Sequence, residues 1–191
     1  MKKQYSNIDY MKLLFALAIP FLHISGGGTV TNIIAQYIAR LGVPFFFCVS
    51  GFLIATQMNE QNDIQTVTNK QLWHVGKLFV LWNVLYFPFV FYSEWKNRGL
   101  LLGGIHYIRE VLFRAPAYLW YISALWVGIW LLQKLYYNKA IVPVAICLYL
   151  IGVLGGSYRD VFLKESMLLN LYETIFITTR NGVFFAFPMI C

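Results

Sequence analysis

The chain has 191 residues, of which 59% are hydrophobic and only 12% are charged. A soluble domain carries about 25% charged residues, so this composition indicates a protein that spans a membrane several times. The net charge of +7 comes from basic residues scattered between apolar segments. This pattern fits contact with anionic lipid headgroups and excludes a nucleic-acid-binding domain, which would gather its basic residues in a patch.

Six apolar segments predict membrane spans, because a helix needs roughly 20 apolar residues to cross the hydrocarbon core. They lie at about 8–25, 32–57, 75–92, 117–137, 140–156 and from about 173 onward. None alternates in the manner of a transmembrane β-strand. The sequence therefore predicts an all-α fold, a polytopic bundle of transmembrane helices, with residues 1–191 forming a single membrane domain.

The segments between the spans give the orientation and two further expectations. Lys2 and Lys3 precede the first span, and no A-x-A-like cleavage site follows it, so it is read as an uncleaved span with its N-terminus in the cytoplasm. The polar segment 59–73 is typical of a cytoplasmic connector. The segment 99–114 predicts an amphipathic helix on the membrane surface.

The first span carries an acid, a cation and an imidazole on one side. Lys12 and His23 are eleven residues apart, which in an α-helix places them within about 20° of one face and about 16 Å apart along the axis. Asp9 falls about 60° from Lys12. Pro20 is expected to bend the helix one turn before His23. These groups are expected to line one cavity, the alternatives being a tolerated kink and an imidazole bonded to a neighbouring helix.

The second span contains the sequence RLGVPFFFCVSGFLI at residues 40–54. Arg40 would cost about 2.5–3.5 kcal/mol in lipid, so it is expected to face a cavity, an acidic partner or an anion. Pro44 is expected to break the helix. The Ser50-Gly51 pair allows close helix approach and offers a hydroxyl, although simple packing explains it equally. The G-x-S-x-G pattern is absent, so Ser50 is not interpreted as a nucleophile.

Two later elements add candidate residues. Trp120 and Tyr121 either shape a site or belong to an interfacial aromatic belt. Arg180 lies in the last apolar segment, where it pairs with an acid, binds an anion or lies at the membrane surface. The three cysteines lack the spacing of a metal site, so no metal is expected.

Taken in order, these motifs resemble the acyltransferase-3 family of integral-membrane acyltransferases. That family opens with Asp-x-x-Arg or Asp-x-x-Lys, ten further residues and a histidine, and this chain has Asp9, Lys12 and His23 at that spacing. The family signature R-x-x-V-P-x-F-F-x-x-S-G-F is similar to residues 40–52. Residues 119–121 (LWY) and 180–188 (RNGVFFAFP) also resemble the family. The latter is most similar to the branch that includes the membrane domains of vancomycin-resistance-type serine racemases.

The resemblance implies a fold of roughly ten spans, of which these six would form an incomplete domain. It implies an enzyme that moves an acyl group, often acetyl, from acyl-CoA to a hydroxyl of a sugar or other cell-envelope acceptor. Such an enzyme is a multi-pass protein of the bacterial inner (plasma) membrane. Its partners are lipid, acyl-CoA as donor and the hydroxyl acceptor, and it needs no bound cofactor.

The resemblance also implies roles for the motif residues. His23 would act as the general base, because an imidazole titrates near neutral pH, with Lys12 and Asp9 completing the catalytic group. Lys12 stands where many members have arginine, and lysine lacks the planar fork that grips an anion in bidentate fashion. The residues implied to bind substrate are Arg40, Ser50, Trp120, Tyr121 and Arg180. Two alternatives stay open: a transporter of a small polar solute such as serine, and a truncated, inactive remnant.

Overall fold

The described part of the chain is helical throughout. A computed structural model describes residues 5–23, 28–61, 63–109, 120–154 and 183–191, and no strand occurs among them. In chain order the elements are α1 (Ser6–Ala18), a 3-10 helix η1 (Ile19–His23), α2 (Thr29–Ile33), a π-helix η2 (Ile34–Ala39), α3 (Arg40–Gln61), α4 (Ile64–Arg98), α5 (Leu100–Arg109), α6 (Trp120–Leu135), α7 (Ile141–Gly152) and α10 (Val183–Ile190). The predicted all-α class is confirmed for these residues.

Two stretches among these residues are long and apolar enough to cross a membrane. They are Thr29–Glu60, with 32 residues, and Ile64–Arg98, with 35 residues, and they contain the spans predicted at 32–57 and 75–92. At 1.5 Å per residue they measure about 48 and 52 Å, longer than the hydrocarbon core of about 30 Å. Among the shorter helices α1 has 13 residues and α7 has 12. The predicted count of six spans is therefore not confirmed.

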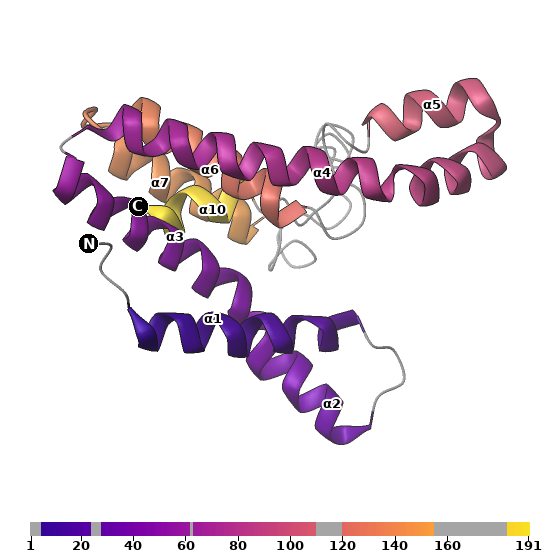
Figure 1. Cartoon of the computed structure of the whole chain (residues 1–191), viewed down its shortest axis with the longest axis horizontal. Helices are drawn as coiled ribbons and strands as arrows, with labels where there is room; N and C mark the ends of the chain where they lie inside the picture. Colours follow the sequence, from indigo (N-terminus) through magenta and orange to yellow (C-terminus); the bar gives the residue numbers. More distant parts are fainter. Residues whose placement is uncertain (1–4, 24–27, 62, 110–119, 155–182) are drawn as a thin grey trace.

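The core lies where α10 packs against α3, α6 and α7 (Figure 1). Although α10 has only eight residues, its Phe187 and Ala186 are fully buried, as is Phe47 of α3. Ile129 of α6 is 2% exposed. The packing therefore brings residues 183–190 against the second span, which lies far earlier in the chain.

Glycines on three helices make room for α10. A Cβ at Gly51 of α3 would lie 2.1 Å from the carbonyl oxygen of Ile190. A Cβ at Gly128 of α6 would lie 2.7 Å from Ile190 Cδ1, and one at Gly152 of α7 would lie 2.9 Å from Phe184 Cβ. Small residues let membrane helices approach closely. The close approach predicted at Gly51 is confirmed.

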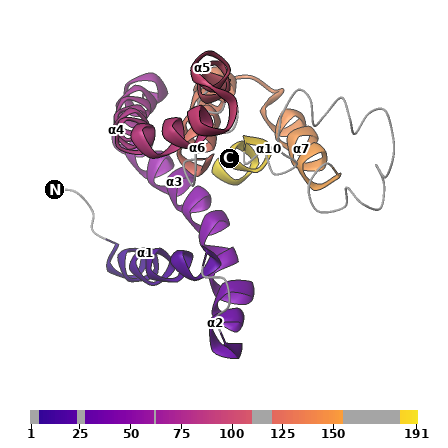
Figure 2. The same cartoon turned by 90° about the vertical axis from the view of Figure 1, so that its right-hand side faces the viewer.

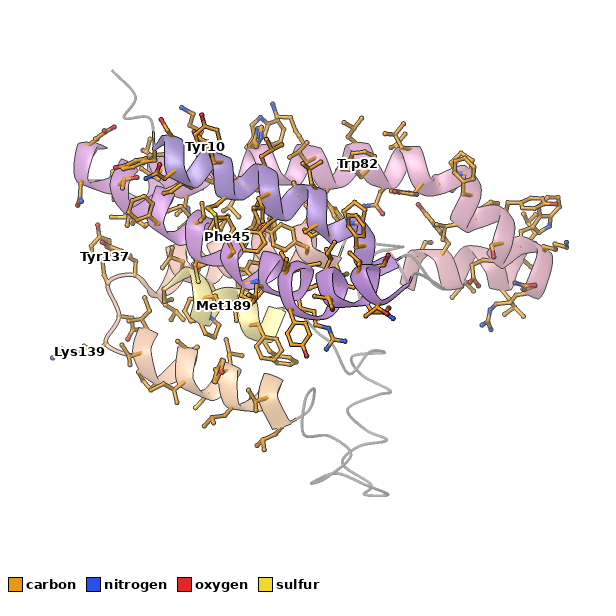
Figure 3. All side chains as sticks on the ribbon, turned by 90° about the horizontal axis from the view of Figure 1, so that it is seen from below. Tyr10, Phe45, Trp82, Tyr137, Lys139 and Met189 are labelled. Carbon is orange, nitrogen blue, oxygen red and sulfur yellow. The ribbon has the colours of Figure 1, made fainter. Side chains whose placement is uncertain are left out.

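The elements α1 and α2 form an arm that stands apart from α4, α5 and α6, with α3 connecting the arm to the core (Figures 1 and 2). The ring of Phe15 packs on Phe45 of α3, with centroids 4.7 Å apart. Tyr5 packs on Phe52 at 5.2 Å. The start of α1 thus lies near the later part of α3, so the two helices run antiparallel. Figure 3 shows Phe45 inside the molecule and Tyr10 on the outer side of α1.

The segment predicted as a surface helix folds back on α4 as α5. Gly99 links the two helices with a positive φ of 80°, a conformation that glycine adopts without strain. A Cβ at Gly103 would lie 3.0 Å from the backbone nitrogen of Trp95, and Tyr107 packs edge-on against Phe87 at 5.2 Å. The predicted helix is present over residues 100–109, its small and aromatic face packs on α4, and its place at a membrane surface stays a prediction. Residues 110–114 lie outside the described part.

The polar segment 59–73 contains the junction between α3 and α4, as predicted, and most of its residues belong to the ends of these two helices. α3 continues to Gln61 and α4 begins at Ile64. Asp63 caps α4, since its carboxylate accepts hydrogen bonds from the backbone N–H groups of Gln65 at 3.0 Å and Thr66 at 3.1 Å. The hydrogen bond from the Thr66 hydroxyl, followed by these two backbone bonds, lowers the pKa of Asp63 below its usual value. A charged cap of this kind favours a helix start in a polar sequence.

Candidate active site

Ser50 of α3 and Tyr121 of α6 meet inside the core. The Ser50 hydroxyl donates to the carbonyl oxygen of Phe46 at 2.7 Å, and the Ser50 side chain lies within reach of the Tyr121 hydroxyl. The Tyr121 ring packs on Phe47, with centroids 4.8 Å apart. The sequence predicted both residues as substrate-binding, and the fold brings them together from two distant helices.

Trp120 stands beside this pair at the first residue of α6. Its side chain is 36% exposed, and its ring centroid lies 6.5 Å from that of Tyr121 in an edge-on arrangement. The described start of α6 thus carries one exposed ring and one ring packed into the core. Arg180, the other predicted residue in this part of the sequence, lies outside the described residues.

Pro44 lies within a continuous helix, so the prediction that it breaks the second span is wrong. α3 runs from Arg40 to Gln61 through Pro44. Proline cannot donate to the carbonyl of Arg40, four residues earlier, and its ring crowds that carbonyl. The irregularity lies one turn upstream, in the π-helix Ile34–Ala39. Such wide turns are uncommon in helices and occur frequently at functional sites.

His23 is the last residue of the 3-10 helix Ile19–His23, which contains Pro20. The tighter winding of about three residues per turn changes the predicted stripe. With six steps of α-helix and five of 3-10 helix, the Cα atoms of Lys12 and His23 lie about 120° apart around the axis, rather than about 20°. The 3-10 helix packs against the π-helix Ile34–Ala39. The His23 side chain itself lies outside the described part of the structure.

Arg40 follows the π-helix directly and lines an open cavity of about 500 Å³. The cavity wall also includes Thr29, Asn32, Ile33 and Tyr37. The Arg40 side chain is exposed, and the described residues place no carboxylate in an ion pair with it. The cavity thus combines a guanidinium, an amide and two hydroxyl groups, which are donors suited to an anionic or polyhydroxylated ligand.

Asp9 and Lys12 form an ion pair on α1. The Lys12 Nζ lies 3.1 Å from Asp9 Oδ1, and the two side chains are 32% and 60% exposed. A pair this exposed contributes at most about 1 kcal/mol to stability. The predicted partnership of Asp9 and Lys12 is present, while Arg40 and the Ser50–Tyr121 pair lie on other elements.

A second cavity, of about 340 Å³, lies between the carboxyl ends of α3 and α6. Its floor includes Ile54, Leu132 and Ile190, and two tyrosines, Tyr136 and Tyr137, stand at one side. Their rings are edge-on at 5.0 Å. Figure 3 shows Tyr137 at the turn after α6, at the edge of the molecule. No sequence pattern indicated this cavity, because its walls come from separate helices.

One buried polar residue was missed by the sequence analysis. Asn83 of α4 is 9% exposed. Its Nδ2 donates to the carbonyl oxygen of Phe79 at 2.8 Å, while its Oδ1 has no partner among the described residues. A buried acceptor without a partner costs about 1–3 kcal/mol. The available signal was a single amide at the middle of the apolar segment 75–92.

The titratable residues do not gather into a metal site in the described ranges. No group of three or more His, Cys, Asp or Glu side chains there could hold a metal ion.

Comparison with known proteins places these elements in a family. The model of the acyltransferase-3 family, described as an acyltransferase domain, matches residues 5–191. An amino-acid racemase of Enterococcus faecalis is 32% identical over 196 residues, which cover 96% of this chain and 27% of the racemase. A serine/alanine racemase of Enterococcus gallinarum is 29% identical over 201 residues, which cover 98% of this chain and 28% of that protein. No solved structure matches the chain significantly.

The chain spans less than a third of the length of these curated relatives. The family match, by contrast, covers nearly all of the chain. It includes the Asp9–Lys12–His23 motif, the signature at 40–52, and the later elements at 119–121 and 180–188. This chain therefore belongs to the acyltransferase-3 family, and its membership supports a membrane acyltransferase.

Proposed function

We propose that this chain carries the catalytic group of an enzyme that moves an acyl group, in the simplest case acetyl, from acyl-CoA to a hydroxyl of a sugar or other cell-envelope acceptor. The enzyme lies in the bacterial plasma membrane as a multi-pass protein with its N-terminus in the cytoplasm. Acyl-CoA enters as donor substrate, and the protein needs no bound cofactor. Because the chain spans less than a third of its relatives, the activity of a whole protein is part of this proposal.

The observation that carries the proposal is the contact between two irregular turns. The 3-10 helix that ends at His23 packs against the π-helix that leads into Arg40. Irregular backbone at membrane depth is tolerated where it is buried in protein or lines a cavity, and Arg40 lies at a depression that is open to the surface. His23, the proposed general base, and Arg40, the proposed anion-binding cation, belong to these neighbouring turns.

The reaction follows from the chemistry of an imidazole. Neutral His23 takes the proton of the acceptor hydroxyl as the hydroxyl oxygen attacks the thioester carbonyl carbon. The tetrahedral intermediate collapses, the C–S bond breaks, and the imidazolium returns its proton to the departing CoA thiolate. The products are an ester and free CoA, and His23 is neutral again.

Cationic side chains assist the donor. Arg40 has no carboxylate in an ion pair with it among the described residues, so its guanidinium is available to a CoA phosphate. Lys12 carries a second positive charge, and Asp9 holds the Lys12 ammonium at 3.1 Å. In the proposal Arg180 provides a further cation, a role that rests on its motif alone.

Hydroxyl groups in the core complete the site. In the proposal the Tyr121 hydroxyl, which lies beside Ser50, faces the acyl group, and Trp120 forms the wall of the substrate path. Hydrogen-bond donors near a developing oxyanion contribute strongly to acyl transfer. The Ser50 hydroxyl donates to the carbonyl oxygen of Phe46, so in the proposal Ser50 shapes the wall beside Tyr121 and does not itself react.

The test is CoA release from acetyl-CoA by the purified chain in detergent, with and without a hydroxyl acceptor. His23→Ala is expected to lower the rate about 10²–10⁴-fold, the usual contribution of a general base. His74→Ala is the matched control, because His74 is an exposed histidine on α4, and it is expected to leave the rate unchanged. Equal rates for the wild type and His23→Ala in a folded sample would contradict the proposal.

A second candidate function is transport of a small amino acid such as serine. It is favoured by the relatives, which are named amino-acid racemase and serine/alanine racemase, and by interrupted helices, which line substrate sites in carriers. A carrier would move serine into vesicles whether or not acyl-CoA is present, whereas an acyltransferase needs acyl-CoA. The dependence of activity on acyl-CoA therefore separates the two functions.

A further inference from the structure

We propose that the carboxamide oxygen of Asn83 accepts a hydrogen bond from the hydroxyl of a bound substrate. The inference rests on the proposed function in one respect, because acyl transfer requires a hydroxyl acceptor. Nothing in the motif analysis or in the comparisons assigns a role to Asn83.

The orientation of the Asn83 amide is fixed by its own helix. Its Nδ2 lies 2.8 Å from the carbonyl oxygen of Phe79. Turning the amide over would set two acceptor oxygens against each other, so the nitrogen belongs there. The group left without a partner among the described residues is Oδ1. Since Oδ1 can only accept, its partner must carry an O–H or N–H group.

The side chain faces the interior and lies midway along the apolar segment. Asn83 is 9% exposed, whereas its neighbours Val84 and Leu85 are 64% and 52% exposed. In a membrane those exposed apolar side chains meet lipid, and Asn83 lies on the opposite side of α4. Polar side chains inside a membrane segment face the bundle interior or a water-filled cavity and mark functional sites.

The register between α4 and α6 sets Asn83 level with the candidate site. Gln133 Nε2 donates to Asn69 Oδ1 at 2.8 Å, near the beginning of α4. Gly76 follows Asn69 by seven residues on α4, and Trp126 precedes Gln133 by seven residues on α6. These two positions are also in contact, because a Cβ at Gly76 would lie 3.5 Å from Trp126 Nε1. A further seven residues along α4 lead to Asn83, and seven residues back from Trp126 lead to the start of α6, so these two places lie at the same level. That first turn carries Trp120 and Tyr121.

The ligand class follows from these observations. An acceptor oxygen at mid-membrane depth, level with Tyr121, suits a substrate hydroxyl that must be held while it reacts. A thioester carbonyl is excluded as the partner, because it has no proton to donate. A sugar and serine both supply the required hydroxyl, so they share the chemistry of this site and the experiment distinguishes them.

Cysteine accessibility tests the inference without relying on catalysis. The three native cysteines are replaced by alanine in the full chain, and Asn83→Cys is compared with Leu85→Cys in vesicles treated with a membrane-impermeant methanethiosulfonate sulfonate. We expect Asn83→Cys to react at least tenfold faster, because in the proposal a polar substrate reaches Asn83 while Leu85 faces lipid. N-acetylglucosamine or serine, added as probe, is expected to slow the reaction, and the probe that does so identifies the source of the hydroxyl. Equal labelling at both positions, or no protection by either probe, would overturn the inference.

Kinetics separates this inference from the proposed function. Asn83→Leu is expected to raise the KM for N-acetylglucosamine at least tenfold. Thr68→Val is the control, because Thr68 is likewise buried on α4 and its hydroxyl donates to the carbonyl of Ile64 at 2.6 Å. If the wild type turns over and Asn83→Leu has an unchanged KM, the inference fails and the proposed function stands. If the wild type has no His23-dependent turnover, the proposed function fails, and cysteine protection alone decides whether Asn83 binds a hydroxyl.

Discussion

Replacing Gly51 by alanine tests the packing of α10 against α3. This packing brings together two of the family motifs, at residues 40–52 and 180–188. An alanine Cβ would lie 2.1 Å from the carbonyl oxygen of Ile190 and 2.8 Å from its carbonyl carbon. Real Cβ atoms essentially never come within 3.0 Å of such an atom, and 2.1 Å is 0.9 Å inside that limit. Both contacts are backbone atoms, so no side-chain rotation relieves them. One helix must therefore shift by about 1 Å.

The cost of that shift is at the upper end of overpacking effects. Such substitutions typically cost about 1–3 kcal/mol, and a rigid backbone contact places Gly51→Ala at about 3 kcal/mol. A chain of this size loses about 2–4 °C in Tm per kcal/mol. The apparent Tm in detergent, followed by tryptophan fluorescence, is therefore expected to fall by about 6–12 °C.

Two other glycines provide matched controls. At Gly128 a Cβ would meet the flexible end of Ile190 at 2.7 Å, so Gly128→Ala is expected to cost about 1–2 kcal/mol. At Gly104, within α5, a Cβ would meet nothing within 4 Å, and alanine there is expected to gain about 0.5–1 kcal/mol from helix propensity. If Gly51→Ala melts with the wild type, or if the three variants melt in the opposite order, α10 is not seated on α3.

The remaining predictions concern the core, the ion pair and a helix cap. Phe47→Ala is expected to cost about 3–5 kcal/mol, because Phe47 is fully buried; an unchanged Tm would place it outside the core. Asp9→Asn is expected to change stability by less than about 1 kcal/mol, so a tenfold fall in its acetyl-transfer rate would report on chemistry. A Tm lowered by more than about 4 °C would show that the variant is instead destabilised. The pKa of Asp63 is lowered from 3.8 in the folded chain, so its charged cap contributes fully above pH 3.8 and is lost as the pH falls through the lower folded value. The Tm difference between the wild type and Asp63→Asn is therefore expected to shrink between pH 4 and pH 2, and a constant difference would refute the assignment.

The helical class and two long membrane helices could be predicted from the sequence, because long apolar segments without alternation carry that information directly. Helix ends could not. Residues 59–73 are polar and were read as a connector, yet the single cap at Asp63 starts α4 there. Pro44 was read as a break, yet the irregular winding lies upstream at 34–39. At Asp63 a single cap residue, rather than the average composition, sets the boundary, whereas Pro44 sets none.

The candidate site divides in the same way. The Asp9–Lys12 pair is three residues apart on one helix, so its geometry is a local property and the sequence predicted it. The contact between Ser50 and Tyr121 depends on how α3 packs against α6, which no local pattern encodes. The stripe shared by Lys12 and His23 assumed uniform α-helical winding, and the 3-10 helix at Ile19–His23 changes it. Asn83 was overlooked because an uncharged amide is a weak signal in an apolar segment.

The central claim is that this chain transfers an acyl group rather than carrying a solute. The most direct measurement follows two isotopes in the same vesicles, with [14C]acetyl-CoA on the side that faces the N-terminus and [3H]serine as the possible cargo. The account predicts that 14C becomes covalently attached to a hydroxyl acceptor, that His23→Ala abolishes this transfer while His74→Ala does not, and that no 3H accumulates in the absence of acetyl-CoA. Accumulation of [3H]serine without acetyl-CoA, together with no His23-dependent transfer of 14C, would contradict it.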